Sequence, residues 1–345
     1  MKLFLSILLL LGGLLQACNQ TTSEEKNGQK QQVWPDVQEL NQSLGRGMNL
    51  GNALEAPNEG DWGVVLQAEY FSLIKNAGFN SVRIPIRWSA HALADSPFTI
   101  DASFFQRVDW AVQQAFQNKL LAVINIHHYN EIFKDPTGHK NRFLALWQQI
   151  ADHYKEYSAD LLFEILNEPH DQLTPELWNQ YLREALTIIR RENPFRAVVI
   201  GTANWGGLDA LEKLQLPDDD HLILTFHYYQ PFHFTHQGAG WVQSSDAWLG
   251  TQWLGTDQEK QAVRADLDCV SQWAAERKVP VFMGEFGAYH KADLASRVRW
   301  TYFVAREAEK RGFSWAYWEF CSGFGIYDAQ NKVWLTELLQ ALIPD

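Results

Sequence analysis

The chain has 345 residues and a formal net charge of −12 at pH 7. This acidic balance excludes the basic face with which proteins bind nucleic acid, so nucleic acid is not an expected partner. The length fits either one large barrel or two smaller domains, and the pattern of elements along the chain has to decide between them.

The first residues have the pattern of an export signal. Lys2 precedes an apolar run over residues 3–15, which is too short for a stable membrane span but fits the hydrophobic part of a signal peptide. The run ends in Leu-Gln-Ala-Cys at residues 15–18, which resembles the lipobox of bacterial lipoproteins, whose cysteine is lipidated. We expect a lipoprotein signal peptide over residues 1–17 and a lipid anchor at Cys18 that holds the protein at the bacterial cell envelope. The alternative is a plain secretory peptide that is cleaved nearby and leaves the protein secreted.

The segment that follows is polar throughout. Residues 19–32 hold no large apolar side chain and cannot contribute to a core, so we expect a flexible tether over residues 18–35 and a catalytic domain over residues 36–345. Apart from Cys18, the chain contains Cys269 and Cys321. Nothing in the sequence brings these two together, and a domain of this size folds without a disulfide, so we expect two reduced and mostly buried thiols.

From residue 36 onward, short apolar runs alternate with amphipathic helical patterns. The expected strands lie at residues 47–50, 81–85, 120–126, 161–166, 197–200, 221–226, 281–285 and 314–318. The expected helices lie at residues 64–76, 102–117, 142–154, 175–191, 257–278 and 294–311. Eight parallel strands joined by helical crossovers predict the α/β class and a single (β/α)₈ TIM barrel. A doubly wound open sheet is the competing fold, but no glycine-rich phosphate loop follows the first strand.

Polar, ionisable and aromatic residues that could act in catalysis or binding gather where the predicted strands end, which is where a barrel of this kind forms its active site. They are Asn52, Glu55, Arg83, His127, His128, Asn167, Glu168, His227, Tyr229, Glu285 and Trp318. Among them, Glu168 and Glu285 each come at or just after an apolar run. Two carboxyl groups that face one cleft are what hydrolysis of a glycosidic bond requires.

These segments together resemble glycoside hydrolase family 5, whose members are retaining (β/α)₈ enzymes that include endoglucanases and mannanases. The matching motifs are Val-Arg-Ile-Pro with Arg83, Ile-Asn-Ile-His-His with His127, Asn167-Glu168-Pro169, His227-Tyr228-Tyr229, Gly284-Glu285-Phe286-Gly287 and Trp-Ala-Tyr-Trp-Glu with Trp318. The resemblance runs from about residue 44 to residue 342. Residues 51–63 and 234–241 resemble a subgroup that acts on both β-glucans and β-mannans.

The resemblance implies that Glu168 is the acid/base and Glu285 the nucleophile, with their carboxyl groups roughly 5 to 5.5 Å apart. The acid then has to stay protonated near neutral pH, whereas the nucleophile has to be ionised. The resemblance also puts Arg83 and Tyr229 beside Glu285, where they would favour its charged form.

The same resemblance implies the contacts with the sugar. Asn167 is expected to hydrogen-bond the sugar 2-hydroxyl, and Trp318 to stack beneath the sugar at the cleavage site. His127 and His227 are expected to hold the catalytic carboxylates and the ring hydroxyls in place. Further expected binding contacts are Asn52, Glu55, His128, His236 and Trp241.

Some of these residues also have structural interpretations. A structural ion pair in the barrel is the alternative for the two glutamates. For Glu164, inside the fourth strand, pairing with an arginine within the barrel is the better interpretation. The clustered histidines could bind zinc, but no His-x-x-x-His helix is present, and the side chains of His127 and His128 should leave a strand on opposite faces. We therefore expect no metal.

The sequence thus predicts a monomeric, endo-acting β-1,4-glycosidase of the cellulase type that uses double displacement and needs no metal or organic cofactor. Its expected partner is a β-linked polysaccharide, and it should meet a membrane only through the lipid anchor. A strict endo-β-1,4-mannanase is the alternative within the same class. A surface lipoprotein that binds glycans without cleaving them is the alternative from another class.

Overall fold

The structure is a computed structural model that describes residues 34–344. The expected signal peptide, the lipidation site Cys18 and nearly all of the expected tether lie outside these residues. Among the helices that the structure does describe, none combines the length and the apolar character needed to cross a membrane.

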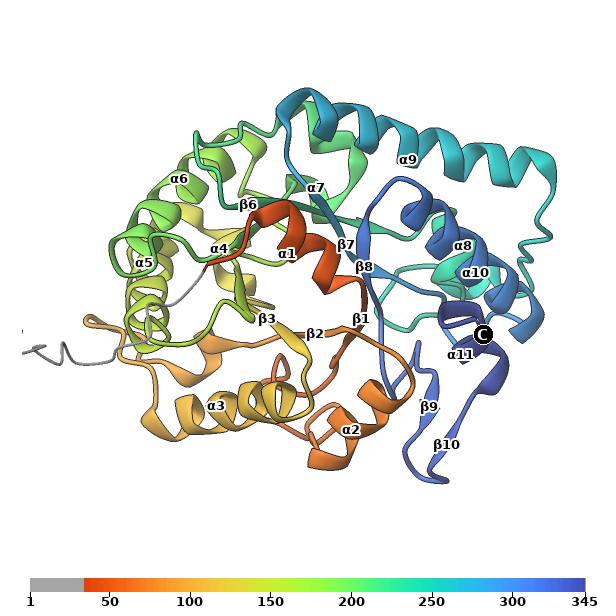
Figure 1. Ribbon diagram of the computed structural model, residues 1–345, viewed down its shortest axis with the longest axis horizontal. Coiled ribbons are helices and arrows are strands. Elements are labelled where there is room, and N and C mark those ends of the chain that lie inside the picture. The colour runs from red at the N-terminus through yellow and green to blue at the C-terminus, as the bar shows by residue number, and fades with distance from the viewer. Residues whose placement is uncertain (1–33, 345) are drawn as a thin grey trace, which may run out of the picture. The chain divides into compact units, whose positions relative to one another are not determined.

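Eight parallel strands close into a barrel in chain order, with the last strand beside the first (Figure 1). They are β1 (Arg46–Asn49), β2 (Ser81–Ile84), β3 (Leu121–Asn125), β4 (Leu161–Glu164), β5 (Val198–Gly201), β6 (Leu222–Tyr228), β7 (Val281–Phe286) and β8 (Ser314–Tyr317). Each predicted strand is confirmed, with its ends shifted by no more than two residues. Because the sheet is closed, the (β/α)₈ barrel is confirmed and the open sheet is wrong.

A ring of helices covers the outside of the barrel (Figure 1). The long ones are α2 (Ala68–Asn76), α3 (Ala102–Gln117), α5 (Pro136–His153), α6 (Pro175–Glu192), α9 (Asp257–Arg277) and α10 (Leu294–Lys310). The predicted start of α5 at residue 142 is wrong, because the Asp135 carboxylate accepts from the Gly138 N–H and Pro136 opens the helix. The predicted start of α2 at residue 64 is also wrong, since the chain becomes helical only at Ala68.

Several short elements have no counterpart in the predicted pattern. They are α1 (Val37–Leu44), α4 (Asn130–Lys134), α7 (Ala203–Gly206), α8 (Phe232–Thr235), α11 (Thr336–Leu342), the 3₁₀ helices η1 (Trp88–His91), η2 (Leu208–Lys213) and η3 (Ser245–Trp248), and the hairpin β9 (Tyr327–Asp328) with β10 (Val333–Trp334). Most are only four to eight residues long, which is too short for a helical period to be recognised in the sequence.

Helix α1 closes the amino-terminal end of the barrel. The Asp36 side chain caps this helix by accepting from the N–H groups of its first turn. The buried side chains of α1 join one apolar cluster with inward-facing strand residues, namely Val37, Leu40, Leu44, Val123, Leu162, Val199, Ile223, Phe282 and Ala316. This end of the barrel is therefore filled, and a cleft can form only at the carboxyl ends of the strands.

Above this apolar layer the barrel interior becomes polar. Residues two apart in a strand point to the same face, so Asn125 follows Val123 into the interior and Glu164 follows Leu162. Arg83 lies in the same layer, and these polar side chains are at most 1% exposed. Buried charges need partners, so the layer has to be a connected network.

The register between β6 and β7 shifts after Phe226, and the shift brings His227 opposite Glu285. Gly284 makes the close approach possible, since a Cβ there would lie 2.6 Å from Thr225 Oγ1. His227 was expected just after the sixth strand, but it lies within β6. The irregular pairing thus places a histidine directly beside one of the two glutamates.

Cys269 and Cys321 are both free thiols, as expected. The expectation that both are mostly buried is wrong for Cys269, which is exposed on α9. The buried face of α9 is formed by Val263, Leu267 and Val270, at the three- and four-residue spacing of a helix, and Cys269 lies outside that face.

Candidate active site

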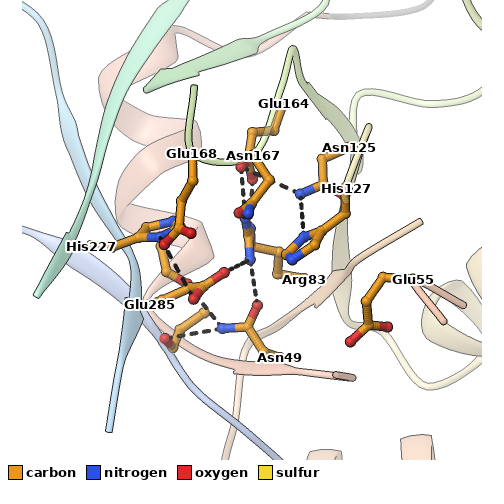
Figure 2. A network of polar contacts seen from close by, with 12 residues as sticks. Asn49, Glu55, Arg83, Asn125, His127, Glu164, Asn167, Glu168, His227 and Glu285 are labelled. Carbon is orange, nitrogen blue, oxygen red and sulfur yellow. Dashed lines mark hydrogen bonds and ion pairs between the residues drawn. The ribbon is translucent and has the colours of Figure 1, made fainter. Parts of the chain in front are cut away.

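Glu168 and Glu285 face each other at the carboxyl end of the barrel, with His227 beside both (Figure 2). His227 Nδ1 lies 2.6 Å from Glu168 Oε1 and 3.6 Å from Glu285 Oε2. One oxygen of each glutamate and the histidine nitrogen all lie within 4.8 Å of one another. The structure thus brings together the two carboxyl groups that the sequence singled out.

Arg83 is the centre of the polar network, and it is fully buried. Its Nη1 donates to Glu285 Oε1 at 2.7 Å and to Asn49 Oδ1 at 2.9 Å. Its Nε and Nη2 donate to the two oxygens of Glu164 at 2.6 and 2.7 Å, and Nη2 also donates to Asn167 Oδ1 at 2.8 Å. The expected arginine partner of Glu164 is therefore Arg83, which at the same time contacts Glu285 (Figure 2).

Tyr229 completes the contacts of Glu285. Its hydroxyl donates to Glu285 Oε2 at 2.9 Å, so each oxygen of this carboxylate has its own donor. The expectation that Arg83 and Tyr229 lie beside Glu285 is confirmed. With Arg83 on one side and Tyr229 on the other, the carboxyl group is fixed in orientation.

The protonation of the pair differs from the expectation. Burial raises the pKa of Glu285 above its ordinary value, more strongly than the positive charges of His227 and Arg83 lower it. Burial also acts to raise the pKa of Glu168, but the hydrogen bond and the charge of His227 lower it below its ordinary value. Arg83 lowers the pKa of Glu285 only in part, because the same guanidinium also pairs with Glu164.

His227 explains where the expected acidic proton resides. Burial opposes its charged form, but the carboxylates of Glu285 and Glu168 raise the pKa of His227 above its ordinary value. His227 and Glu168 share a short hydrogen bond, so one proton belongs to the pair rather than to either residue alone. Glu168 therefore has a proton available even though its own pKa is lowered.

His127 does not have the contacts expected of it. Within residues 34–344 it makes no polar contact with Glu168 or Glu285; its ring instead stacks on Trp318, with centroids 5.8 Å apart and planes at 13°. Burial lowers the pKa of His127 well below its ordinary value, so the ring stays neutral. His127 thus braces the indole of Trp318 instead of holding a carboxylate.

His128 lies against His127, and the expectation that their side chains leave on opposite faces is wrong. Their ring centroids are 4.3 Å apart, because both residues come after the end of β3 and His128 has a φ of 54°. Burial lowers the pKa of His128 to about 4. Its ring also meets the half-exposed Trp62 edge-on at 5.2 Å, which makes Trp62 an aromatic neighbour of the site that the sequence did not suggest.

Glu55 does not reach the cleft, so its expected role as a binding contact is wrong. Its side chain is fully buried, and its carboxylate accepts from the N–H groups of Asn52 and Ala53. Burial raises the pKa of Glu55 to about 8. Figure 2 shows it apart from the Arg83 network, where it holds the loop after β1. Asn52, in the same loop, is half-buried.

A cavity of about 1290 Å³ opens from Glu168, His227 and Tyr229 across the loops that follow β5 and β6. His236 lines it and stacks on Phe232, with centroids 4.1 Å apart. Trp241 also lines it and is 63% exposed. The structure thus gathers these two expected binding residues on the Glu168 side of the pair.

Other residues of the site were missed by the sequence interpretation. Trp205, in the short element α7 after β5, lines the same cavity and is 53% exposed. The strand-end rule that found the other residues would have found it, had it been applied to the fifth strand. Asn49 and Asn125 are the last residues of β1 and β3, and they were missed because the predicted strands continued past them, so that only the inward alternation marks them.

Among the described residues, Glu168, His227 and Glu285 form the one group of side chains close enough to hold a metal ion. Arg83 places a positive charge 2.7 Å from an oxygen of Glu285, which disfavours a cation at that carboxylate. The expected absence of a metal stays a prediction.

Comparison with known proteins finds similar sequences among cellulases and endoglucanases. The family model for cellulase, glycosyl hydrolase family 5, matches residues 39–323. Endoglucanase H of Acetivibrio thermocellus is 38% identical over 313 residues, which are 89% of this chain but only 33% of that protein. Endoglucanase B of Clostridium cellulovorans is 30% identical over 329 residues, which are 86% of this chain and 73% of that protein.

Solved structures resemble the whole barrel. Cel5A of Thermotoga maritima, solved in complex with cellobiose and also with mannotriose, superposes with a TM-score of 0.88 at 56% sequence identity. The match covers 89% of this chain and 100% of that chain.

Proposed function

The chain belongs to the cellulase family, glycosyl hydrolase family 5, and from this premise we propose that it is a retaining endo-β-1,4-glucanase. The observation that carries the proposal is the close approach of the two carboxyl groups. An oxygen of Glu168 lies within 4.8 Å of an oxygen of Glu285. This spacing fits the roughly 5 to 5.5 Å of a retaining pair and is shorter than the roughly 6.5 to 9.5 Å that an inverting enzyme needs for a water molecule.

In the first step Glu285 attacks the anomeric carbon while the bond to the leaving oxygen breaks. Arg83 and Tyr229 hold the carboxylate in place, so that attack requires no reorientation. Glu168 gives the leaving oxygen the proton that it shares with His227. The products of this step are the released sugar chain and a glycosyl ester on Glu285.

In the second step a water molecule attacks the same carbon. The ester on Glu285 is neutral, so it no longer raises the pKa of His227. The Glu168–His227 pair, which gave up its proton in the first step, therefore stays deprotonated and is available as the base. Glu168 takes the proton of the water, and Glu285 leaves as a carboxylate that Arg83 and Tyr229 stabilise again. The anomeric configuration is retained because it is inverted twice.

The sugar contacts follow from which groups are already engaged. The oxygen of Asn167 accepts from Arg83, so the amide nitrogen is the end that can donate to the sugar 2-hydroxyl. Trp318, braced by His127, offers the stacking surface at the cleavage site. Asn52, His128, His236 and Trp241 are the proposed contacts with neighbouring sugars.

The charges along the cavity support a neutral polysaccharide as substrate. Among the described residues, its lining contains the carboxyl groups of Glu168, Asp209, Glu259 and Asp266 and neither lysine nor arginine. Anionic sugars would be repelled there, whereas hydroxyl groups find acceptors. The relatives named endoglucanase support a β-glucan.

β-Mannan is the second candidate substrate, and the mannotriose complex of the similar Thermotoga maritima Cel5A supports it. The test is the initial release of reducing sugar from barley β-glucan and from linear β-mannan by the purified protein. Release from β-glucan, lost in Glu168→Ala and in Glu285→Gln, is the expected result. Release from mannan alone would support a strict mannanase instead, and binding without release from either would support a non-catalytic glycan-binding protein.

We also propose that the protein is exported and anchored through a lipid on Cys18. The support is the residue pattern over residues 1–18 alone. Expression of the full chain in a bacterium, followed by detergent-phase separation, tests it. The wild type should enter the detergent phase and Cys18→Ala should not, whereas equal partition of both would leave a plain secretory signal.

A further inference from the structure

His170 lies between two aromatic rings two residues after Glu168. Its ring centroid is 3.9 Å from that of Phe133 and 4.8 Å from that of Trp205, with which it stacks at 14°. Phe133 belongs to α4 and is 3% exposed, so it anchors the inner end of this column of rings. Trp205 forms the outer end and is half-exposed.

His170 is also bonded to the backbone of the proposed acid. Its Nδ1 lies 2.5 Å from the Glu168 carbonyl oxygen. A carbonyl can only accept, so Nδ1 carries the proton and the tautomer of the ring is fixed. One imidazole thus fixes the backbone beside Glu168 through its edge and the indole of Trp205 through its face.

The backbone at both ends of this contact is in the left-handed region. Glu168 has a φ of 46° and Trp205 a φ of 58°, a conformation that residues with side chains rarely adopt. Such positions persist only where surrounding contacts hold them, and they cluster at functional sites. The Trp205 N–H donates to the Pro169 carbonyl at 3.3 Å, so the loops after β4 and β5 are joined a second time here.

Glu168 and Trp205 line the same cavity. If Glu168 protonates the leaving oxygen, the sugar that departs has to lie on this side of the pair, within reach of Trp205. The orientation of the acid and the orientation of the aromatic surface would then both depend on His170.

We propose that His170 is a positioning residue that aligns Glu168 with Trp205, the stacking surface for the leaving-group sugar. This inference rests on the proposed function. It predicts that His170 matters for substrates whose leaving group is a sugar that needs a proton, and matters little where the leaving group needs neither protonation nor stacking.

Two substitutions separate the two contacts. His170→Phe keeps an aromatic ring in the column but removes the donor to the Glu168 carbonyl. His170→Asn keeps a donor near the position of Nδ1 but removes the ring. His153 gives a matched control, because it also stacks on an aromatic ring, Phe105, at 4.2 Å and hydrogen-bonds through its imidazole, but lies outside the cavity lining.

The experiment measures kcat and KM for cellohexaose and for dinitrophenyl β-cellobioside, whose leaving group departs without a proton. With cellohexaose, His170→Phe should lower kcat by about 10- to 100-fold, because a small displacement of the acid costs that much. His170→Asn should raise KM about five-fold through the loosened indole. Both variants should keep kcat/KM for the dinitrophenyl substrate within about two-fold, because this ratio reports the first step, in which the leaving group needs no proton. His153→Phe should leave all constants unchanged.

Equal losses of kcat/KM on both substrates at an unchanged melting temperature would overturn the inference, as would wild-type constants for both His170 variants on cellohexaose. If His170→Phe melts at a lower temperature, His170→Asn alone decides by the same criteria. A wild-type protein that cleaves neither substrate would refute the proposed function itself, and this result is distinct from a wild type that is active while the His170 variants match it.

Discussion

The guanidinium of Arg83 lies 2.7 Å from the carboxylate of Glu285, and both groups are buried in the barrel interior. The same guanidinium forms a bidentate ion pair with Glu164 through its Nε and Nη2 atoms. One positive charge therefore pairs with two buried carboxylates, and Glu285, at the reaction centre, receives only one hydrogen bond from the guanidinium. This arrangement fixes the geometry of Glu285 without making it so stable an anion that it could not attack.

Arg83→Lys should lower kcat by about 10²- to 10³-fold, the usual cost of removing one preorganised donor from a reaction centre. A lysine cannot contact Glu164, Glu285 and Asn167 at once, since its ammonium is a point charge. Steady-state kinetics on β-glucan checks the prediction. Arg190→Lys is the matched control, because Arg190 forms a similar bidentate ion pair with Asp219 away from the cleft. A comparable loss in both variants would mean that Arg83 acts only through stability.

Tyr229→Phe should lower kcat by about 10- to 100-fold with little change of the melting temperature. The hydroxyl donates to Glu285 at 2.9 Å, and a hydrogen bond to a charged group contributes about 1.5 to 3 kcal/mol. Tyr228→Phe removes a neighbouring hydroxyl that bonds to Asp266 and not to Glu285. An activity loss in Tyr228→Phe as large as that in Tyr229→Phe would contradict the assignment.

The pH profile of kcat/KM should be bell-shaped, and both of its limbs should lie at higher pH than those of two carboxyl groups with ordinary pKa values. Its acid limb belongs to ionisation of Glu285, whose pKa burial raises above the ordinary 4.5. Its alkaline limb belongs to loss of the proton from the Glu168–His227 pair, where the carboxylates raise the pKa of His227 above the ordinary 6.5. Rates on barley β-glucan measured from pH 4 to about pH 10 check both limbs. An alkaline limb below pH 6.5 would contradict the shared proton.

Glu55 should make the fold less stable as the pH rises. Burial raises its pKa from 4.5 to about 8, so between these values the folded protein binds more protons than the unfolded chain and the free energy of unfolding falls with pH. The melting temperature should therefore be higher at pH 5 than at pH 8, and Glu55→Gln should reduce the difference. The exposed Glu156→Gln should not. An unchanged difference in Glu55→Gln would show that the carboxyl is not buried as described.

Gly284→Ala should destabilise the protein by about 1 to 3 kcal/mol and lower kcat as well, because the added methyl group would meet Thr225 Oγ1 at 2.6 Å and push β6 and β7 apart at His227. Gly201→Ala is the control, since its methyl group would meet Thr225 at an ordinary 3.5 Å. Thermal melting and kinetics of both variants check this. Equal effects would remove the special role of the β6–β7 register.

The sequence predicted those parts of the fold that repeat along the chain. Strand-like runs separated by amphipathic helices indicated the barrel, and the rule that chemistry lies at strand ends found Glu168, Glu285 and most of their neighbours. The sequence did not reveal that α1 fills the amino-terminal end of the barrel. This helix has only eight residues and directly follows the polar segment, so its helical periodicity could not be recognised.

The remaining errors come from side-chain contacts that the spacing of residues along the chain does not show. Glu55 has a strand-end position, but its carboxylate turns back to its own loop, which no spacing reveals. His127 faces Trp318 across the barrel instead of a carboxylate. The proton distribution between Glu168 and Glu285 depends on a register shift that places His227 beside both, and the sharing of Arg83 with Glu164 is equally invisible in a single sequence.

The central claim, that Glu285 forms a covalent intermediate, is tested most directly by trapping it. The protein is incubated with a dinitrophenyl cellobioside that carries fluorine in place of the 2-hydroxyl, and the adduct is located by peptide mass spectrometry. The account predicts one adduct, on Glu285, and none in Glu285→Gln. An adduct on another residue, or no adduct while the protein hydrolyses the unfluorinated cellobioside, would contradict it.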